Sequence, residues 1–155
     1  MNKQEIAEKI KQTEEQLASL RAELEEDYPT LESSKAGDKL ENGCIVVHKF
    51  EDVRMALIAA PKSTEVCCKW NNKFFDAFNA LELKGFNPTQ WFIPTGEMLT
   101  LAYKNCKEHF TFYNYWSSNE VNYAISWGMN FPNGILFNGD NNNKYCVRAF
   151  SLVSY

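Results

Sequence analysis

Apolar residues recur at alternating intervals of three and four positions over residues 3–27, the period of a helix that packs against another helix. Glu, Lys, Gln and Ala fill the positions between, and Gly and Pro are absent. Because the stripe is narrow, we expect residues 1–28 to form a coiled-coil helix that joins the chain into a homo-oligomer, a trimer or a dimer. An amphipathic helix that packs against its own domain is the alternative. The heptad a and d positions are Ile6, Ile10, Thr13, Leu17, Leu20 and Leu24.

This period ends at residue 28. Pro29, a pair of serines and Gly37 interrupt regular structure, so residues 29–40 are predicted to be a linker. Short β-rich runs follow at residues 44–48 and 56–61 and are predicted to be strands.

Two helices are predicted next, over residues 72–85 and 94–106, the second capped by Thr95. The chain then changes to short strands and turns, and Pro132-Asn133-Gly134 is strong turn chemistry. The later strand segments are residues 122–131, 134–138 and 145–153. This order predicts an α+β fold over residues 41–155, with two helices and a mixed or antiparallel sheet that the carboxyl terminus closes late.

Charge and hydropathy limit the partners. The 155 residues carry a net charge of -4, which disfavours nucleic acid, because phosphate binding requires a basic surface. No apolar run approaches the roughly 18–20 residues that span a bilayer, and the polar start has no secretory signal, so we expect no membrane insertion.

The five cysteines show no CxxC spacing, and without a secretory signal we expect buried free thiols rather than disulfides. They are Cys44, Cys67, Cys68, Cys106 and Cys146. Cys106 and His109 have the spacing of half a zinc site, but the sequence offers no second half. We therefore expect neither a metal nor a cofactor.

Four ordered motifs carry a resemblance to a known family. Trp91-Phe92-Ile93-Pro94-Thr95 precedes Glu97-Met98, Tyr115-Trp116-Ser117-Ser118 forms a YWSS motif, Trp127 and Phe131 precede Gly134, and Val147-Arg148-Ala149 comes near the end. Together they resemble the Lcl C-terminal domain, a bacterial and phage C-type-lectin-like family, over about residues 40–155.

The resemblance implies a C-type-lectin-like fold that displays a variable surface. Several members of the family are target proteins of diversity-generating retroelements, which randomise adenines in asparagine codons. Eight of the 16 asparagines lie between Asn119 and Tyr145. The resemblance therefore implies a receptor-binding or display protein of a phage virion or the bacterial cytoplasm, whose partner is a protein or surface receptor.

Strand alternation gives the candidate site. If Trp127, Met129 and Phe131 point into the core, residues 126, 128 and 130 point outward. For residues 134–138 two registers remain, one that exposes Ile135 and Phe137 and one that exposes Leu136. The first would place apolar anchors among amides, as in a paratope. The predicted ligand-binding residues are Asn122, Tyr123, Asn130, Ile135, Phe137, Asn138, Asn141, Asn142 and Tyr145.

Other activities have less support from the sequence. Calcium-dependent sugar binding requires several convergent oxygen ligands, but Asp140 is the single acid between Val121 and Tyr155. Formylglycine-generating enzymes share the broader fold, yet no activated cysteine or nucleophile motif is evident. Arg148 is predicted to be structural, paired with a carboxylate or backbone carbonyls. We expect a binding protein rather than an enzyme; an enzyme on the same fold and a purely structural phage oligomer are the alternatives.

Overall fold

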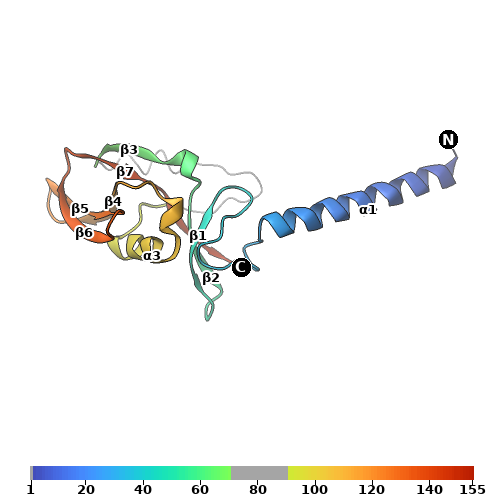
Figure 1. Cartoon of the computed structure of the whole chain (residues 1–155), viewed down its shortest axis with the longest axis horizontal. Helices are drawn as coiled ribbons and strands as arrows, with labels where there is room; N and C mark the ends of the chain where they lie inside the picture. The colour runs from blue at the N-terminus through green and yellow to red at the C-terminus, as the bar shows by residue number, and fades with distance from the viewer. Residues whose placement is uncertain (1, 71–90) are drawn as a thin grey trace.

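The computed structural model describes residues 2–70 and 91–155 (Figure 1). The predicted helix over residues 72–85 lies outside the described residues. The described elements are α1 (Lys3–Asp27), β1 (Ile45–Phe50), β2 (Met55–Ala59), the 3-10 helix η1 (Lys62–Thr64), β3 (Val66–Lys69), α3 (Gly96–Cys106), the 3-10 helix η2 (Lys107–His109), β4 (Asn114–Glu120), β5 (Ile125–Asn130), β6 (Ile135–Asp140), β7 (Lys144–Val147) and β8 (Phe150–Ser154). The predicted α+β class is confirmed.

Helix α1 begins at a reciprocal cap. The side-chain oxygen of Asn2 accepts a hydrogen bond from the Glu5 amide at 2.9 Å, and the Asn2 amide donates to the Glu5 carboxylate at 2.9 Å. The helix extends away from the rest of the chain as a rod (Figure 1). None of the helices in the described part of the chain is long and apolar enough to cross a membrane.

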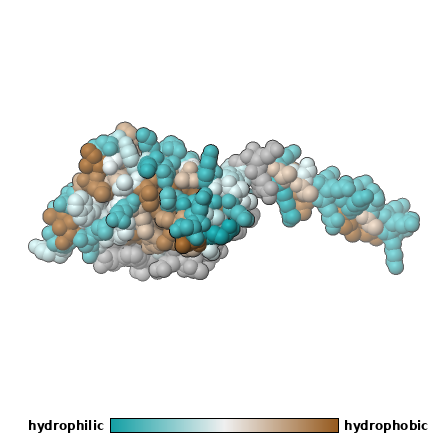
Figure 2. Space-filling view, turned by 90° about the horizontal axis from the view of Figure 1, so that it is seen from below, coloured by the Kyte–Doolittle hydropathy of each residue, from teal (hydrophilic) through white to brown (hydrophobic). Residues whose placement is uncertain are grey.

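The apolar stripe of α1 lies in solvent. Side chains of residues 3–23 are exposed throughout, including Ile10 (54% exposed) and Leu20 (61% exposed). Figure 2 shows apolar residues along one side of the rod. The helix therefore does not pack against its own domain, which was the alternative prediction for this segment.

The described residues of the domain form two sheets. Strands β1, β2 and β8 form a three-stranded antiparallel sheet in that order, so the last strand closes the sheet that the first strands begin. The second sheet has the order β3-β7-β4-β5-β6 and is mixed, because β4 and β7 are parallel while the other pairs are antiparallel. The late closure that the sequence predicts is confirmed. Strands β3 and β4 were not predicted, because VCCK is short and YWSSNE lacks clear alternation.

Helix α3 covers part of one face of the five-stranded sheet. The hydroxyl of Thr95 accepts a hydrogen bond from the Met98 amide, which confirms the predicted cap. The buried face of the helix carries Leu99, Ala102 and Cys106, and it packs in one cluster with Tyr115, Met129, Phe131, Phe110 and Phe150. This contact fixes the position of α3 relative to β4 and β5.

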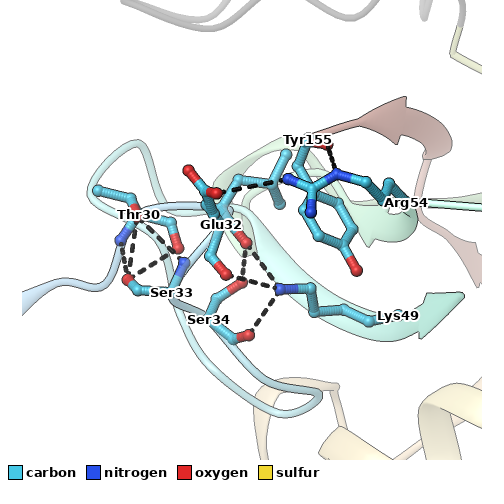
Figure 3. A network of polar contacts seen from close by, with 8 residues as sticks. Thr30, Glu32, Ser33, Ser34, Lys49, Arg54 and Tyr155 are labelled. Atoms are coloured by element: carbon cyan, nitrogen blue, oxygen red, sulfur yellow. Dashed lines mark hydrogen bonds and ion pairs between the residues drawn. The ribbon is translucent and has the colours of Figure 1, made fainter. Parts of the chain in front are cut away.

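Residues 29–40 contain no helix or strand, but they are fastened to the domain (Figure 3). The Lys49 ammonium donates to the carbonyl oxygens of Leu31, Glu32 and Ser34 at 3.0, 3.0 and 2.9 Å. It also lies 4.0 Å from the centre of the Tyr155 ring, a cation–π contact. This segment therefore ties the base of α1 both to β1 and to the carboxyl terminus.

The buried Arg148 side chain links separate segments of the core by hydrogen bonds. Its side chain is 1% exposed, Nε donates to the carbonyl of Ala60 at 2.6 Å, and Nη1 donates to that of His109 at 2.6 Å. The guanidinium also lies 4.6 Å from the centre of the Phe110 ring. Burial lowers the pKa of this arginine from its ordinary value. The predicted structural role is confirmed, and of the two predicted kinds of partner, a carboxylate or backbone carbonyls, the structure shows backbone carbonyls.

The prediction of free thiols is wrong for two cysteines. Cys67 of β3 lies directly opposite Cys146 of β7, and the two form a disulfide. Cys44, Cys68 and Cys106 are free. The two partners are 79 positions apart, and their proximity follows from the pairing of β3 with β7, which the sequence did not predict.

Candidate functional site

The hairpin of β5 and β6 has two faces of different character. Its register places Gly128 opposite Phe137, Met129 opposite Leu136 and Trp127 opposite Asn138. Directly opposite residues in an antiparallel pair share a face. We call the side with Gly128 and Phe137 the Phe137 face, and the side with Trp127, Leu136 and Asn138 the Trp127 face.

The Phe137 face carries a cluster of aromatic rings. The centre of the Tyr145 ring lies 4.5 Å from that of Trp116, and it meets Phe137 edge to face at 5.3 Å. Two glycines make room for these rings. A Cβ at Gly128 would lie 2.8 Å from Phe137 Cζ, and one at Gly139 would lie 2.9 Å from the Tyr145 ring. Trp116 is buried beneath the cluster, while Phe137 and Tyr145 are half-buried.

The Trp127 face is only partly covered by α3. Met129 is buried beneath the helix. Trp127 and Leu136 are each 37% exposed, because the helix begins at Gly96 and does not cover them. They border an open pocket of about 460 Å³. The backbone of Gly96 forms part of its wall, and the remaining lining side chains are Thr95, Glu97, Asn119, Glu120, Trp127 and Leu136.

The placement of Trp127 corrects the sequence prediction. Trp116, Phe131 and Arg148 are buried as expected, but Trp127 is not part of the core, and the polar Ser126 beside it is fully buried. The reason is the position of the helix, because α3 begins at Gly96, against Leu136 and Asn119, and does not reach Trp127. Hydrophobicity indicates which side chains should be buried, but not where a covering helix begins.

Neither predicted register of residues 134–138 is correct. Ile135 is 61% exposed, as the first register requires, but Leu136 is also 37% exposed and Phe137 is half-buried against Tyr145. Both faces of β6 are partly covered, so strict alternation between core and solvent does not apply. The predicted turn at residues 132–134 is confirmed, with Gly134 at φ +72°.

Two turns meet at the end of the sheet where β5 begins. The Asn141 amide donates to the Ala124 carbonyl at 2.9 Å, and the Asn141 side chain donates to the Tyr123 carbonyl at 3.3 Å. Tyr123 is 99% exposed, and Asn122 and Asn142 beside it are also exposed. These residues form a polar tip with one aromatic side chain fully in solvent.

Many of the asparagines shape turns. The Asn122 side chain accepts a hydrogen bond from the Ala124 amide at 2.8 Å, Asn130 accepts from Asn133 at 3.1 Å, and Asn133 accepts from Ile135 at 3.0 Å. Asparagine stabilises turns through such bonds. Asn138 and Asn142, in contrast, are exposed, and their side-chain amides have no partner among the described residues.

The structure therefore divides the predicted ligand-binding residues into three groups. The Phe137 face holds Asn130, Ile135, Phe137 and Tyr145, the tip holds Asn122, Tyr123, Asn141 and Asn142, and the Trp127 face holds Asn138. Asn138 lies opposite Trp127, beside a pocket that the sequence did not predict. Nothing in the sequence indicates that residues 95–97 and 119–120 approach the same tryptophan.

The remaining chemistry of the described residues is structural. Burial raises the pKa of the Cys44 and Cys106 thiols to about 12, so neither is a thiolate at neutral pH. The Glu65 carboxylate lies within 4.8 Å of the sulfurs of Cys67 and Cys146, but the disulfide occupies both sulfurs. Glu65 instead accepts hydrogen bonds from the Tyr115 and Thr111 hydroxyls.

No family model matches the chain, and no curated protein matches its sequence.

Proposed function

We propose that this protein is a homo-oligomeric, calcium-independent ligand-binding protein, in which a C-type-lectin-like domain displays a recognition surface at the end of a coiled-coil helix. One observation carries the proposal: large side chains on and beside the β5–β6 hairpin are exposed to solvent. Tyr123 is 99% exposed, Ile135 is 61% exposed, and Trp127 and Leu136 are 37% exposed. Two of these side chains, Trp127 and Leu136, border one pocket, and exposed apolar side chains that lie close together in a folded domain are typical of a binding surface.

The composition of this surface supports the same function. Rigid aromatic rings stand among exposed amides, a combination that gives paratopes both anchors and adaptable polar contacts. The hairpin also lies at the end of the molecule opposite α1 (Figure 1). An oligomer formed through α1 would therefore carry several copies of the surface outward, and weak single contacts would act together.

The resemblance to retroelement-diversified proteins adds an expectation about the gene. Exposed Asn138 and Asn142 suit variation, because their side chains form no bond within the described chain. We expect the flanking DNA to contain a near-identical repeat that differs at adenines, beside a reverse transcriptase gene. Flanking sequence without such a repeat would overturn the diversification part of the proposal and leave the binding function untouched.

Oligomerisation through α1 is expected to depend on the exposed stripe. Ile10→Asp with Leu17→Asp places two charges at a positions of the heptad, so the oligomer should dissociate to monomers. Light scattering at tens of micromolar protein measures the mass. Gln12→Asp with Ser19→Asp is the matched control, since it adds the same charge on the c positions. A wild-type monomer, or a control that dissociates equally, would contradict a coiled coil.

The displayed positions are expected to tolerate substitution. Replacing Tyr123, Ile135, Asn138 or Asn142 singly with Ser should change the free energy of unfolding by no more than about 0.5 kcal/mol, because these side chains are exposed. Denaturant unfolding measures each change. Tyr145→Ser is the contrasting variant, since that ring packs against Trp116 and Phe137, and it should be clearly destabilising. Equal losses at both kinds of position would mean that the surface is structural.

Calcium independence follows from the acids available. Asp140 is the single acid between Val121 and Tyr155, and its carboxylate accepts a hydrogen bond from the Asn142 amide at 2.8 Å. This carboxylate, and the two of Glu97 and Glu120 beside Trp127, are far fewer than the six to eight oxygen ligands that calcium requires.

A further inference from the structure

The pocket on the Trp127 face is acidic. Glu97 at the start of α3 and Glu120 at the end of β4 both line it, while none of the Lys, Arg or His residues among residues 2–70 and 91–155 does. The ion pairs among the described residues join Arg54 to Glu32 and His109 to Glu108, so both pocket carboxylates are unpaired. The pocket is therefore electrostatically complementary to a cation.

The helix terminus beside the pocket does not favour an anion instead. Backbone amides at the start of a helix attract anions when they are free. Here the Gly96 amide donates to the Asn119 side chain at 2.7 Å, and the Met98 and Leu99 amides donate to Thr95 at 3.2 and 3.0 Å. Three of the four amides of the first turn therefore have partners, and the fourth belongs to Glu97, whose own carboxylate lines the pocket.

Trp127 adds an aromatic surface of the kind that binds cations. Tryptophan is the most favourable side chain for a cation–π contact with an ammonium or a guanidinium. Its indole is 37% exposed and borders the same pocket as Glu97 and Glu120. The indole can pack against the flat guanidinium of an arginine or the apolar stem of a lysine. The two carboxylates can pair with the positive charge of either side chain.

A second, apolar groove adjoins the pocket and indicates that the cation belongs to a peptide segment. The groove has a volume of about 390 Å³ and shares Thr95 and Glu97 with the pocket. Its other lining side chains include Met98, Leu101 and Leu152, and none of its lining residues in the described part of the chain is basic. An apolar residue next to the cation would fit there.

We infer that the pocket bordered by Trp127, Glu97 and Glu120 binds a lysine or arginine side chain of a protein ligand, with a neighbouring apolar residue of that ligand in the adjoining groove. This inference rests on the proposed ligand-binding function and specifies the chemistry that one part of the surface recognises.

Fluorine NMR of the full chain labelled with 5-fluorotryptophan tests the inference. The protein has four tryptophans, and loss of one signal in Trp127→Phe assigns Trp127. Butylguanidinium should shift the Trp127 signal in a saturable manner, whereas butylurea, its neutral counterpart, should not. Acetyl-Arg-Leu-amide should bind more tightly than either butylguanidinium or acetyl-Arg-Ser-amide, because its leucine reaches the groove.

Matched variants separate the pocket from general charge effects. Glu97→Gln with Glu120→Gln should lower the association constant for butylguanidinium about fivefold, since two exposed ion pairs are lost. Glu41→Gln with Glu108→Gln removes the same charge from residues that line neither the pocket nor the groove, and should leave binding unchanged.

Four results would overturn the inference. Equal binding of butylurea, or binding of methyl glucoside instead, would mean that the pocket recognises a neutral ligand. A dipeptide no tighter than butylguanidinium would mean that free small cations are the ligand. These results would leave the proposed function standing, because that function is tested by oligomerisation and by the tolerance of the displayed positions. Equal weakening by the two double variants would show that net charge alone attracts the probe.

Discussion

Trp116→Ala is expected to lower the free energy of unfolding by about 3–5 kcal/mol, the usual cost of truncating a fully buried aromatic residue. Trp116 is 0% exposed, its indole nitrogen donates to the Cys68 carbonyl at 3.0 Å, and the Tyr145 ring packs on it. Removing the ring would leave a cavity under the Phe137 face and an unsatisfied carbonyl. Denaturant unfolding of the purified variant measures the loss.

Trp127→Ala is the matched control, because it removes the same side chain from the same sheet. Since Trp127 is 37% exposed and borders an open pocket, we expect a loss of no more than about 1 kcal/mol. Similar losses for the two variants would show that Trp127 is part of the core after all. Loss of butylguanidinium binding in this stable variant, measured by calorimetry because the variant lacks the Trp127 fluorine signal, would in addition link the exposed indole to recognition.

Loss of the disulfide is expected to lower the free energy of unfolding about as much as Trp116→Ala does. Cys67 and Cys146 are separated by 79 positions, and the chain-entropy relation for a closed loop of that length gives about 4.5 kcal/mol. Measured losses for native disulfides are about 2–5 kcal/mol. Cys67→Ser should therefore reduce the free energy of unfolding by several kcal/mol, and adding a reductant to the wild type should give the same value.

Cys68→Ser is the control for the disulfide, because Cys68 is the adjacent residue and its thiol is free. This variant should remain sensitive to reductant, whereas Cys67→Ser should not. Thiol titration of the denatured, unreduced wild type should find three thiols. Five thiols, or a reductant that has no effect on wild-type unfolding, would contradict the bond.

The attachment of α1 affects how the proposed oligomer would present its binding sites to a ligand. A flexible linker lets each domain search independently, whereas a fastened one fixes the spacing of the copies. Lys49 holds the segment after α1 through three carbonyl oxygens and the Tyr155 ring. The proposed sites would therefore stand at defined separations, and binding would be strongest for ligands with a matching repeat.

Several features were determined by the sequence because they depend on neighbours a few positions apart. The heptad spacing and absence of Gly and Pro predicted α1, Thr95 predicted the start of α3, and Pro132-Asn133-Gly134 predicted the turn before β6. A structural Arg148, paired with a carboxylate or with backbone carbonyls, was also predicted, because a guanidinium has several hydrogen-bond donors. The structure shows the backbone carbonyls.

The tertiary structure alone decided which of these residues meet and which are left exposed. Pairing of β3 with β7 joined Cys67 to Cys146, and the first residue of α3 left Trp127 in solvent beside Glu97 and Glu120. Most asparagines shape turns, while Asn138 and Asn142 remain available on the surface. Local spacing fixes the period and ends of an element, but burial depends on what another element covers, and this depends on contacts between residues far apart in the chain.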